Sequence, residues 1–256
     1  MRLHNKKLLS RDSTIWCLLA MGLIISPVEK ARSASIEAEG NIIADGVSLI
    51  MLKNTLCNHL AQGVSPLPPL CSPLEAGEQL VFVTSTVSPT GANLAGWADN
   101  LGLPGTPFTD GLLAADAVCQ HHADKAGLEG TYKAWLSTDT VNAKDRVGDH
   151  KWIRTDGVVV ADSLADLLDC SNPDCLQSSI SLTESGGTPP GNYVYTGTLS
   201  SGVSIGTGDC AAWTSSTDTS SQYYLGSHST PAASWTEDVY WSFCDIVNYP
   251  LYCFGF

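Results

Sequence analysis

The stretch that decides the fold is GLLAADAVCQHHADKAGLEGTYKAWLST, residues 111–138 of a 256-residue chain. Asp110, just before it, can accept hydrogen bonds from the free N–H groups of a first helical turn, and Gly127 suits the left-handed position that ends a helix. Between them, small and apolar residues recur every three or four positions. This spacing predicts a helix over 111–126 with Cys119 on its inner face, and TYKAWLST then predicts a strand.

Further strand-like runs lie on both sides of this unit. They are residues 79–87, 150–162, 192–199, 210–215, 238–244 and 251–256. SLADLLD at 163–169 predicts a short second helix, whereas the Gly/Pro/Asn-rich stretch 88–109 and later Gly/Ser/Thr-rich stretches predict long loops. Since the helices do not alternate regularly with the strands, we expect an α+β fold, with one main helix and a short one against a twisted, mostly antiparallel sheet.

The N-terminus has the features of a secretory signal. Four basic residues precede or flank the start of the apolar run IWCLLAMGLII, which is too short to span a bilayer. Ala31 and Ser33 are small residues that suit cleavage after position 33. We therefore divide the chain into a signal peptide (1–33), an N-terminal extension or linker (34–78) and a main domain (79–256), with no transmembrane segment after cleavage. An uncleaved membrane anchor is the alternative.

The composition is acidic, with 26 Asp and Glu against 13 Lys and Arg and a formal charge of −13. Loss of the predicted signal would make the charge −17, because it carries six basic and two acidic residues. Such a surface repels phosphate and sulfate groups, so nucleic acid and heparin-like polyanions are not expected partners. The 43% hydrophobic content is enough for a folded core and excludes a wholly disordered chain.

Eight cysteines follow the predicted signal: Cys57, Cys71, Cys119, Cys170, Cys175, Cys210, Cys244 and Cys253. An even number in a secreted chain predicts disulfide bonds formed in an oxidising compartment. Zinc is the alternative, but the sequence contains no C-x-x-C pair. Spacing alone cannot choose among roughly 100 possible pairings. A local bridge between Cys57 and Cys71 would staple the extension.

The helix–strand segment resembles the start of the endostatin domain, the C-terminal fragment of collagens XV and XVIII. The family pattern A-D-x-x-C-x-x-x-A-x-x-x-G-L-x-G-T-[FY]-[KR]-A-[FW]-L-S is matched from Ala115 to Ser137. The order of Cys210, Trp213, YYLGS, Cys244 and LYCF agrees with the end of that domain. DGVVVADSLADLLD and YTGT look more like secreted bacterial relatives of endostatin, a family classed as a domain of unknown function.

This resemblance covers roughly residues 79–256 and implies a C-type lectin-like fold. It also implies two long-range disulfide bonds, Cys119–Cys253 and Cys210–Cys244. The four remaining cysteines would pair locally, as Cys57–Cys71 and Cys170–Cys175. The zinc-binding histidines and the basic heparin-binding surface of endostatin have no counterpart in this sequence.

GVSIG at 202–206 matches the G-x-S-x-G motif of serine hydrolases. Ser204 would be the nucleophile, with Asp209 or Asp218 and His228 following in the hydrolase order. The motif requires a strand before the serine and a helix after it, and this context predicts neither. A secreted serine hydrolase is therefore an alternative function, and a coincidence in a Gly/Ser-rich loop is the favoured interpretation.

Metal ligands are also difficult to identify. His121 and His122 are neighbours on the predicted helix and point about 100° apart, so they suit partly exposed side chains better than a chelating pair. Acidic residues recur in the predicted loops: Asp139, Asp145, Asp149, Asp156, Asp169 and Asp174. Calcium-dependent carbohydrate binding is a second alternative, although the chain lacks the E-P-N, Q-P-D and W-N-D motifs of calcium-binding lectins.

Four residues in predicted loops are candidates for ligand contact. They are Trp97 and Trp235, as aromatic anchors, and Asp169 and Asp174, as acidic contacts. For the two tryptophans, burial in the core is the favoured alternative. The signal peptide, the lectin-like resemblance and the lack of a credible nucleophile–base or metal-ligand set in the sequence favour a secreted, non-enzymatic binding or adhesion module. It would recognise an extracellular protein or glycoconjugate through long loops, without catalytic residues, cofactor or metal.

Overall fold

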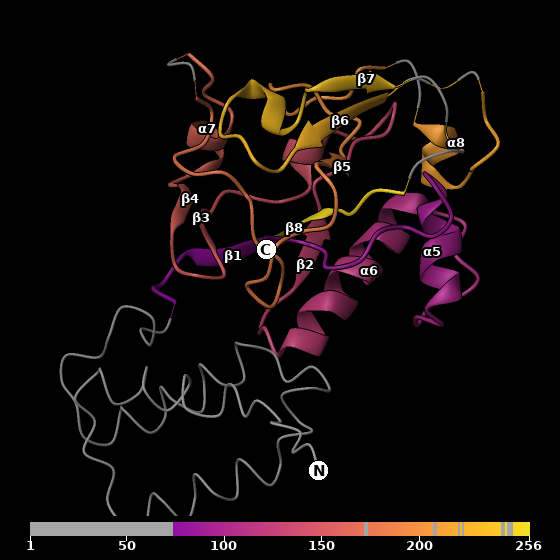
Figure 1. Ribbon diagram of the computed structural model, residues 1–256, viewed down its shortest axis with the longest axis horizontal. Helices are drawn as coiled ribbons and strands as arrows, with labels where there is room; N and C mark the ends of the chain where they lie inside the picture. Colours follow the sequence, from indigo (N-terminus) through magenta and orange to yellow (C-terminus); the bar gives the residue numbers. More distant parts are fainter. Residues whose placement is uncertain are drawn as a thin grey trace, which may run out of the picture. The chain divides into compact units, whose positions relative to one another are not determined.

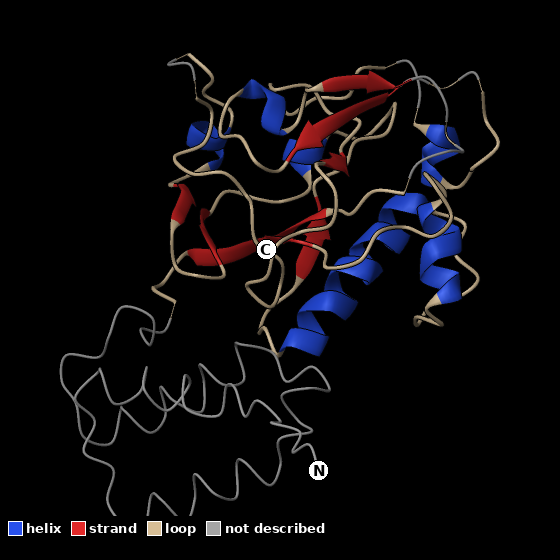
Figure 2. Cartoon of the chain, viewed as in Figure 1, coloured by secondary structure: helices blue, strands red, loops and turns tan. Residues whose placement is uncertain are grey.

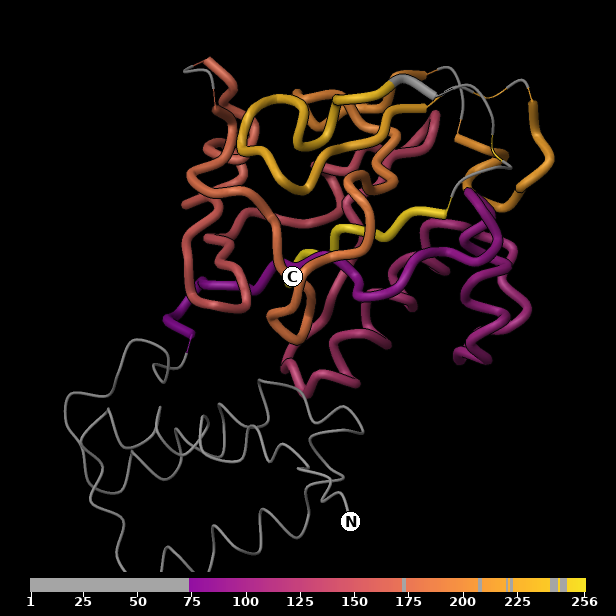
Figure 3. The backbone as a smooth tube through the Cα atoms, in the orientation of Figure 1, coloured from indigo at the N-terminus to yellow at the C-terminus, as the bar shows by residue number. Residues whose placement is uncertain are grey.

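The computed structural model describes residues 74–256, except 172–173, 207–208, 220, 222, 242–243 and 245–247. The predicted signal peptide, most of the predicted extension and the Cys57–Cys71 pair lie outside the described residues. Within them, no helix is long and apolar enough to cross a membrane. Figure 3 traces the course of the described chain, and Figure 2 shows in tan how much of it is loop.

A five-stranded mixed sheet lies at the centre of the described domain (Figures 1 and 2). Its strands are β1 (Glu78–Val83), β2 (Tyr132–Ala134), β3 (Lys151–Arg154), β4 (Val159–Ala161) and β8 (Tyr252–Gly255). Their order is β2-β8-β1-β3-β4, and only the β1–β3 pairing in this sheet is parallel. The predicted α+β class and the mostly antiparallel pairing are confirmed.

A second, smaller sheet is antiparallel throughout its described pairings, in the order β5-β6-β7. Its strands are β5 (Tyr193–Tyr195), β6 (Tyr223–Ser227) and β7 (Val239–Trp241), and two short 3-10 turns are η2 (Ala143–Asp145) and η3 (Ala233–Trp235). All but one of the strand-like sequence runs contain strands, and each strand is shorter than its run, whereas β6 lies outside the predicted runs. Long loops take up the rest, as the abundance of Gly, Ser and Thr predicts.

Two predicted helices are confirmed. Helix α6 spans Gly111–Ala126, where the Asp110 side chain accepts hydrogen bonds from the first turn and Gly127 has the expected left-handed φ of 69°. Helix α7 (Leu164–Leu167) begins at a Ser163 cap. The structure adds a helix, α5 (Leu94–Asn100), in the stretch predicted to be a loop. The Asn93 side chain caps α5, and its buried face packs beside α6.

The strand predicted over 210–215 is wrong. Cys210–Trp213 instead forms the short element α8, whose four residues all have positive φ angles between 54° and 61°. The Asp209 carboxylate accepts a hydrogen bond from the Ala212 N–H group, and the buried Trp213 indole donates to the carbonyl oxygen of Ser137 at 2.7 Å. These contacts hold a left-handed turn that such residues rarely adopt.

The central sheet separates two hydrophobic clusters. Phe82 on β1 and Cys253 on β8 pair directly and face the cluster that contains α5 and α6. Their neighbours Val81 and Phe254 face the second cluster, which is rich in tryptophan. Both strands thus bury both faces, because successive side chains of a strand point to opposite sides of the sheet.

Three of the four expected disulfide bonds lie within the described residues. Cys119 on α6 joins Cys253 on the face of β8 that packs against α6, with Cα atoms 5.4 Å apart. Cys210–Cys244 ties α8 to the segment after β7, and Cys170–Cys175 closes a local loop. The pairings implied by the resemblance are therefore confirmed for the two long-range bridges.

Candidate binding site

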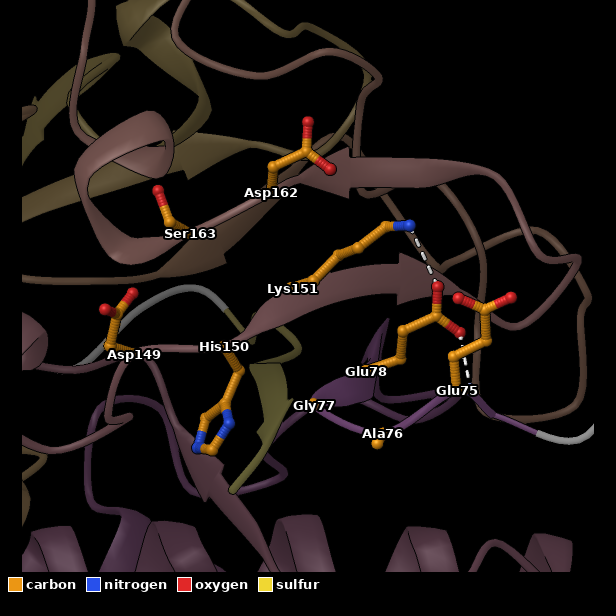
Figure 4. Close-up of a pocket in the computed structure, with 9 residues that line it drawn as sticks. All are labelled: Glu75, Ala76, Gly77, Glu78, Asp149, His150, Lys151, Asp162 and Ser163. Atoms are coloured by element: carbon orange, nitrogen blue, oxygen red, sulfur yellow. Dashed lines mark hydrogen bonds and ion pairs between the residues drawn. The ribbon is translucent and has the colours of Figure 1, made fainter.

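A shallow depression of about 290 Å³ opens where β1 and β3 begin (Figure 4). Its lining residues come from three segments: 75–78, 149–151 and 162–163. Parallel pairing places Glu78 directly beside Lys151. Since β4 runs antiparallel to β3, residues 162–163, which follow β4, lie beside the start of β3. The sheet therefore assembles the depression from residues 75–78 and from two segments that lie more than 70 positions later in the sequence.

One ion pair lies at the centre of the depression. Lys151 Nζ lies 2.9 Å from Glu78 Oε1, and the other carboxylate oxygen of Glu78 accepts a hydrogen bond from the Glu75 N–H group at 2.9 Å. This backbone hydrogen bond, followed by the contact with Lys151, lowers the pKa of Glu78. The same carboxylate raises the pKa of Lys151. Both groups are therefore charged at neutral pH.

The depression has an excess of negative charge. It contains four acidic residues, Glu75, Glu78, Asp149 and Asp162, together with Lys151 and His150. Asp149 Oδ1 accepts a hydrogen bond from the Leu164 N–H group at 2.7 Å, and Asp162 Oδ2 accepts one from the Gln177 side chain at 2.7 Å. A carboxylate can accept several hydrogen bonds, so these contacts fix the side chains without saturating them.

An exposed aromatic ring lies next to this depression. Phe256, which is 48% exposed, meets the His150 ring edge to face, with the ring centroids 6.4 Å apart. The ammonium group of Lys133 lies 3.7 Å from the centroid of the Phe256 ring, within cation–π distance. The rim of the depression therefore combines an apolar surface with charged groups.

The two tryptophans proposed as ligand contacts are buried. Trp97 is 2% exposed on the inner face of α5, and Trp235 is fully buried against Trp135 and Tyr252. Both indoles pack in the core and neither is exposed for contact with a ligand at the surface. The sequence predicts loops at both positions, because its local pattern does not indicate the helix α5 or the 3-10 turn η3.

Asp169 and Asp174 are exposed and flank the Cys170–Cys175 bridge. The side chain and N–H group of Ser171 hydrogen-bond to the Asp169 carboxylate and lower its pKa. Neither aspartate lines the depression. They remain candidates for surface contact at a separate position.

The residues of the hydrolase motif do not meet one another. Ser204 Oγ accepts a hydrogen bond from Gly206, and the Asp209 carboxylate caps α8. The His228 ring is buried and bonds to the carbonyl oxygen of Gly191. Among the residues that the structure describes, no group of three or more His, Cys, Asp or Glu side chains could hold a metal ion.

The His122 side chain is more buried than the sequence predicts. It is 5% exposed rather than partly exposed, and it joins a hydrogen-bonded cluster with Glu184, Ser85 and Thr86. Sequence reasoning missed this cluster because its members come from three separate segments, and no local motif connects them.

Models of known protein families give no match to this chain, and a search of curated proteins finds no significant relative.

Proposed function

We propose that this chain is a secreted binding or adhesion module that holds a basic segment of an extracellular protein in its acidic depression. The observation that carries the proposal is the set of four carboxylates around Lys151. A cationic side chain entering there would gain several favourable charge contacts, whereas an anionic ligand would be repelled. The overall charge of −13 would also speed the encounter with a basic partner.

The proposed fold is the C-type lectin-like fold of the endostatin type. The link from the main helix to the final strand through Cys119–Cys253 supports it, as does the second bridge, Cys210–Cys244. Three disulfide bonds support folding in an oxidising, extracytoplasmic compartment. The scaffold alone does not define the ligand, so the proposed recognition depends on the depression.

The test is a binding titration with a fluorescent Lys-Arg hexapeptide, followed by anisotropy at low and at physiological salt. The double variant Asp149→Asn/Asp162→Asn keeps an acceptor oxygen for Leu164 and Gln177 but removes two charges. We expect it to bind about 3- to 30-fold more weakly, because each exposed charge contact contributes up to about 1 kcal/mol.

The matched control is Asp169→Asn/Asp174→Asn, which removes the same charge from exposed positions outside the depression. It should change the affinity by less than about twofold. Equal weakening in both double variants would show that only overall charge matters and would contradict the proposed site. Absence of peptide binding together with binding to neutral glycans would favour the glycoconjugate alternative.

A further inference from the structure

A buried histidine connects an exposed hydroxyl group to a buried carboxylate. His122 lies on the inner face of α6, Glu184 lies in the loop between α7 and β5, and Thr86 follows β1. The side chains of His122 and Glu184 are each 6% exposed, whereas Thr86 is exposed at the surface. A base shielded from water thus lies directly beneath a hydroxyl that solvent can reach.

The two ring nitrogens of His122 have different partners. Nδ1 lies 3.0 Å from Glu184 Oε1, and Nε2 lies 3.0 Å from Thr86 Oγ1. A carboxylate can only accept, so a neutral ring carries its proton on Nδ1. Nε2 is then the acceptor for the Thr86 hydroxyl proton. This order of hydroxyl, imidazole and carboxylate is the arrangement that activates a nucleophilic oxygen.

Glu184 is fixed in its charged form by two further contacts. The N–H group of Ser85 donates to Oε2 at 3.0 Å, and the Ser85 hydroxyl hydrogen-bonds to Oε1. Burial alone would raise the pKa of Glu184, but the hydrogen bonds from His122 and Ser85 oppose it, and the pKa is lowered. The carboxylate therefore orients the imidazole and acts as a positioning residue.

The imidazole is also held from the side. The edge of the His122 ring meets the buried Trp97 ring, with centroids 6.3 Å apart. The helix fixes the position of the His122 backbone, and Gly127 and Asp110 fix the two ends of that helix. A base held in this way is already oriented toward the hydroxyl group, so little entropy is lost in bringing the two groups together for proton transfer.

We propose that Thr86 is a nucleophilic hydroxyl that cleaves carboxylic esters, with His122 as its general base. Thr86 Oγ1 attacks the ester carbonyl carbon and transfers its proton to His122 Nε2. The bond to the alcohol then breaks, and the alcohol leaves with that proton, which gives an acyl-threonine ester. Water attacks this ester through the same base, releases the carboxylic acid and restores the Thr86 hydroxyl.

Two other serine hydroxyl groups can be compared with Thr86. The Ser85 hydroxyl bonds directly to the Glu184 carboxylate, with no imidazole between them. Ser204 lies in the G-x-S-x-G match, but its hydroxyl bonds to a backbone N–H group. The proposal therefore requires reactivity at Thr86 and not at the other two hydroxyls.

The test uses the whole oxidised protein with a fluorophosphonate probe and with p-nitrophenyl acetate. Peptide mapping by mass spectrometry should find the probe on Thr86. Thr86→Val should lose the label and slow ester hydrolysis at least 10-fold, whereas Thr86→Ser should retain both. Since Thr86 is exposed, its valine variant should fold, and circular dichroism checks this. Ser204→Ala should keep the label.

Two further measurements make the outcome decisive. Glu184→Gln should lower kcat for p-nitrophenyl acetate with little change in KM, which is the effect expected of a positioning residue. Labelling and ester hydrolysis are measured without the peptide, so a failure of the proposed peptide binding is distinguishable from a failure here. An unlabelled Thr86 in the folded protein, a label on Ser204, or an unchanged rate in Thr86→Val would each overturn the proposal.

Discussion

Glu184 accepts three hydrogen bonds at a position that is only 4% exposed. They come from His122 Nδ1, the Ser85 N–H group and the Ser85 hydroxyl. A buried charge with several donors stabilises the folded state only while it remains ionised. The pKa of Glu184 is lowered from its ordinary value of 4.5, so its carboxylate supports folding at neutral pH.

The pH dependence of stability follows from this direction. In the unfolded chain Glu184 becomes protonated as the pH falls past about 4.5, whereas in the folded protein it stays ionised to a lower pH. Its contribution is therefore complete above that value and is lost as the pH falls through the folded pKa. Urea unfolding of the native protein and of Glu184→Gln should show a free-energy difference that shrinks between pH 5 and pH 3. A difference that stays constant over this range would contradict the assignment.

Single residues were predictable where their partners are close in sequence. Asp110 and Gly127 could be assigned to the ends of α6 because a helix cap depends on two or three neighbouring positions. His122 could not be assigned, since its carboxylate partner lies 62 positions away. Asp116 likewise fits the family motif, but its ion pair with Arg146 at 2.6 Å becomes visible only in the folded chain.

Among the elements, α6 and α8 show what local sequence can and cannot predict. The periodicity of α6 is strong, and the structure reproduces its predicted bounds. CAAWTS is a short apolar run with one tryptophan, which predicts a strand, yet Cys210–Trp213 adopts a left-handed turn. That turn depends on the Cys210–Cys244 bridge and on close contact with the start of α6, and both are tertiary.

Gly111 is the point where these two elements touch. A Cβ atom there would lie 2.1 Å from the carbonyl oxygen of Ala212 and 2.6 Å from the Cβ atom of Trp213. Gly111→Ala should therefore lower the free energy of unfolding by about 1–3 kcal/mol, although alanine favours helices. Leu113→Ala, on the same turn at a position 61% exposed, should change it by less than about 0.5 kcal/mol. Equal effects in urea titrations would show that α8 does not pack there.

At the scale of the whole molecule, the element types were more predictable than their pairing. Apolar strand runs at the two ends of the domain were evident, but their sequence does not specify that β1 lies between β8 and β3. Such pairing is decided by contacts between residues far apart in the chain, as in Val81 opposite Phe254. The acidic depression follows from this topology, because parallel pairing of β1 with β3 brings Glu78 to Lys151.

The three disulfide bonds close loops of very different length and should therefore stabilise the domain unequally. They span 134 residues for Cys119–Cys253, 34 for Cys210–Cys244 and 5 for Cys170–Cys175. If restriction of the unfolded chain dominates, replacing each pair by alanine should cost about 5, 4 and 2 kcal/mol, respectively.

Urea unfolding of the three double variants measures this order. The opposite order would mean that contacts of each bridge in the folded core, and not the lengths of the loops, determine its contribution.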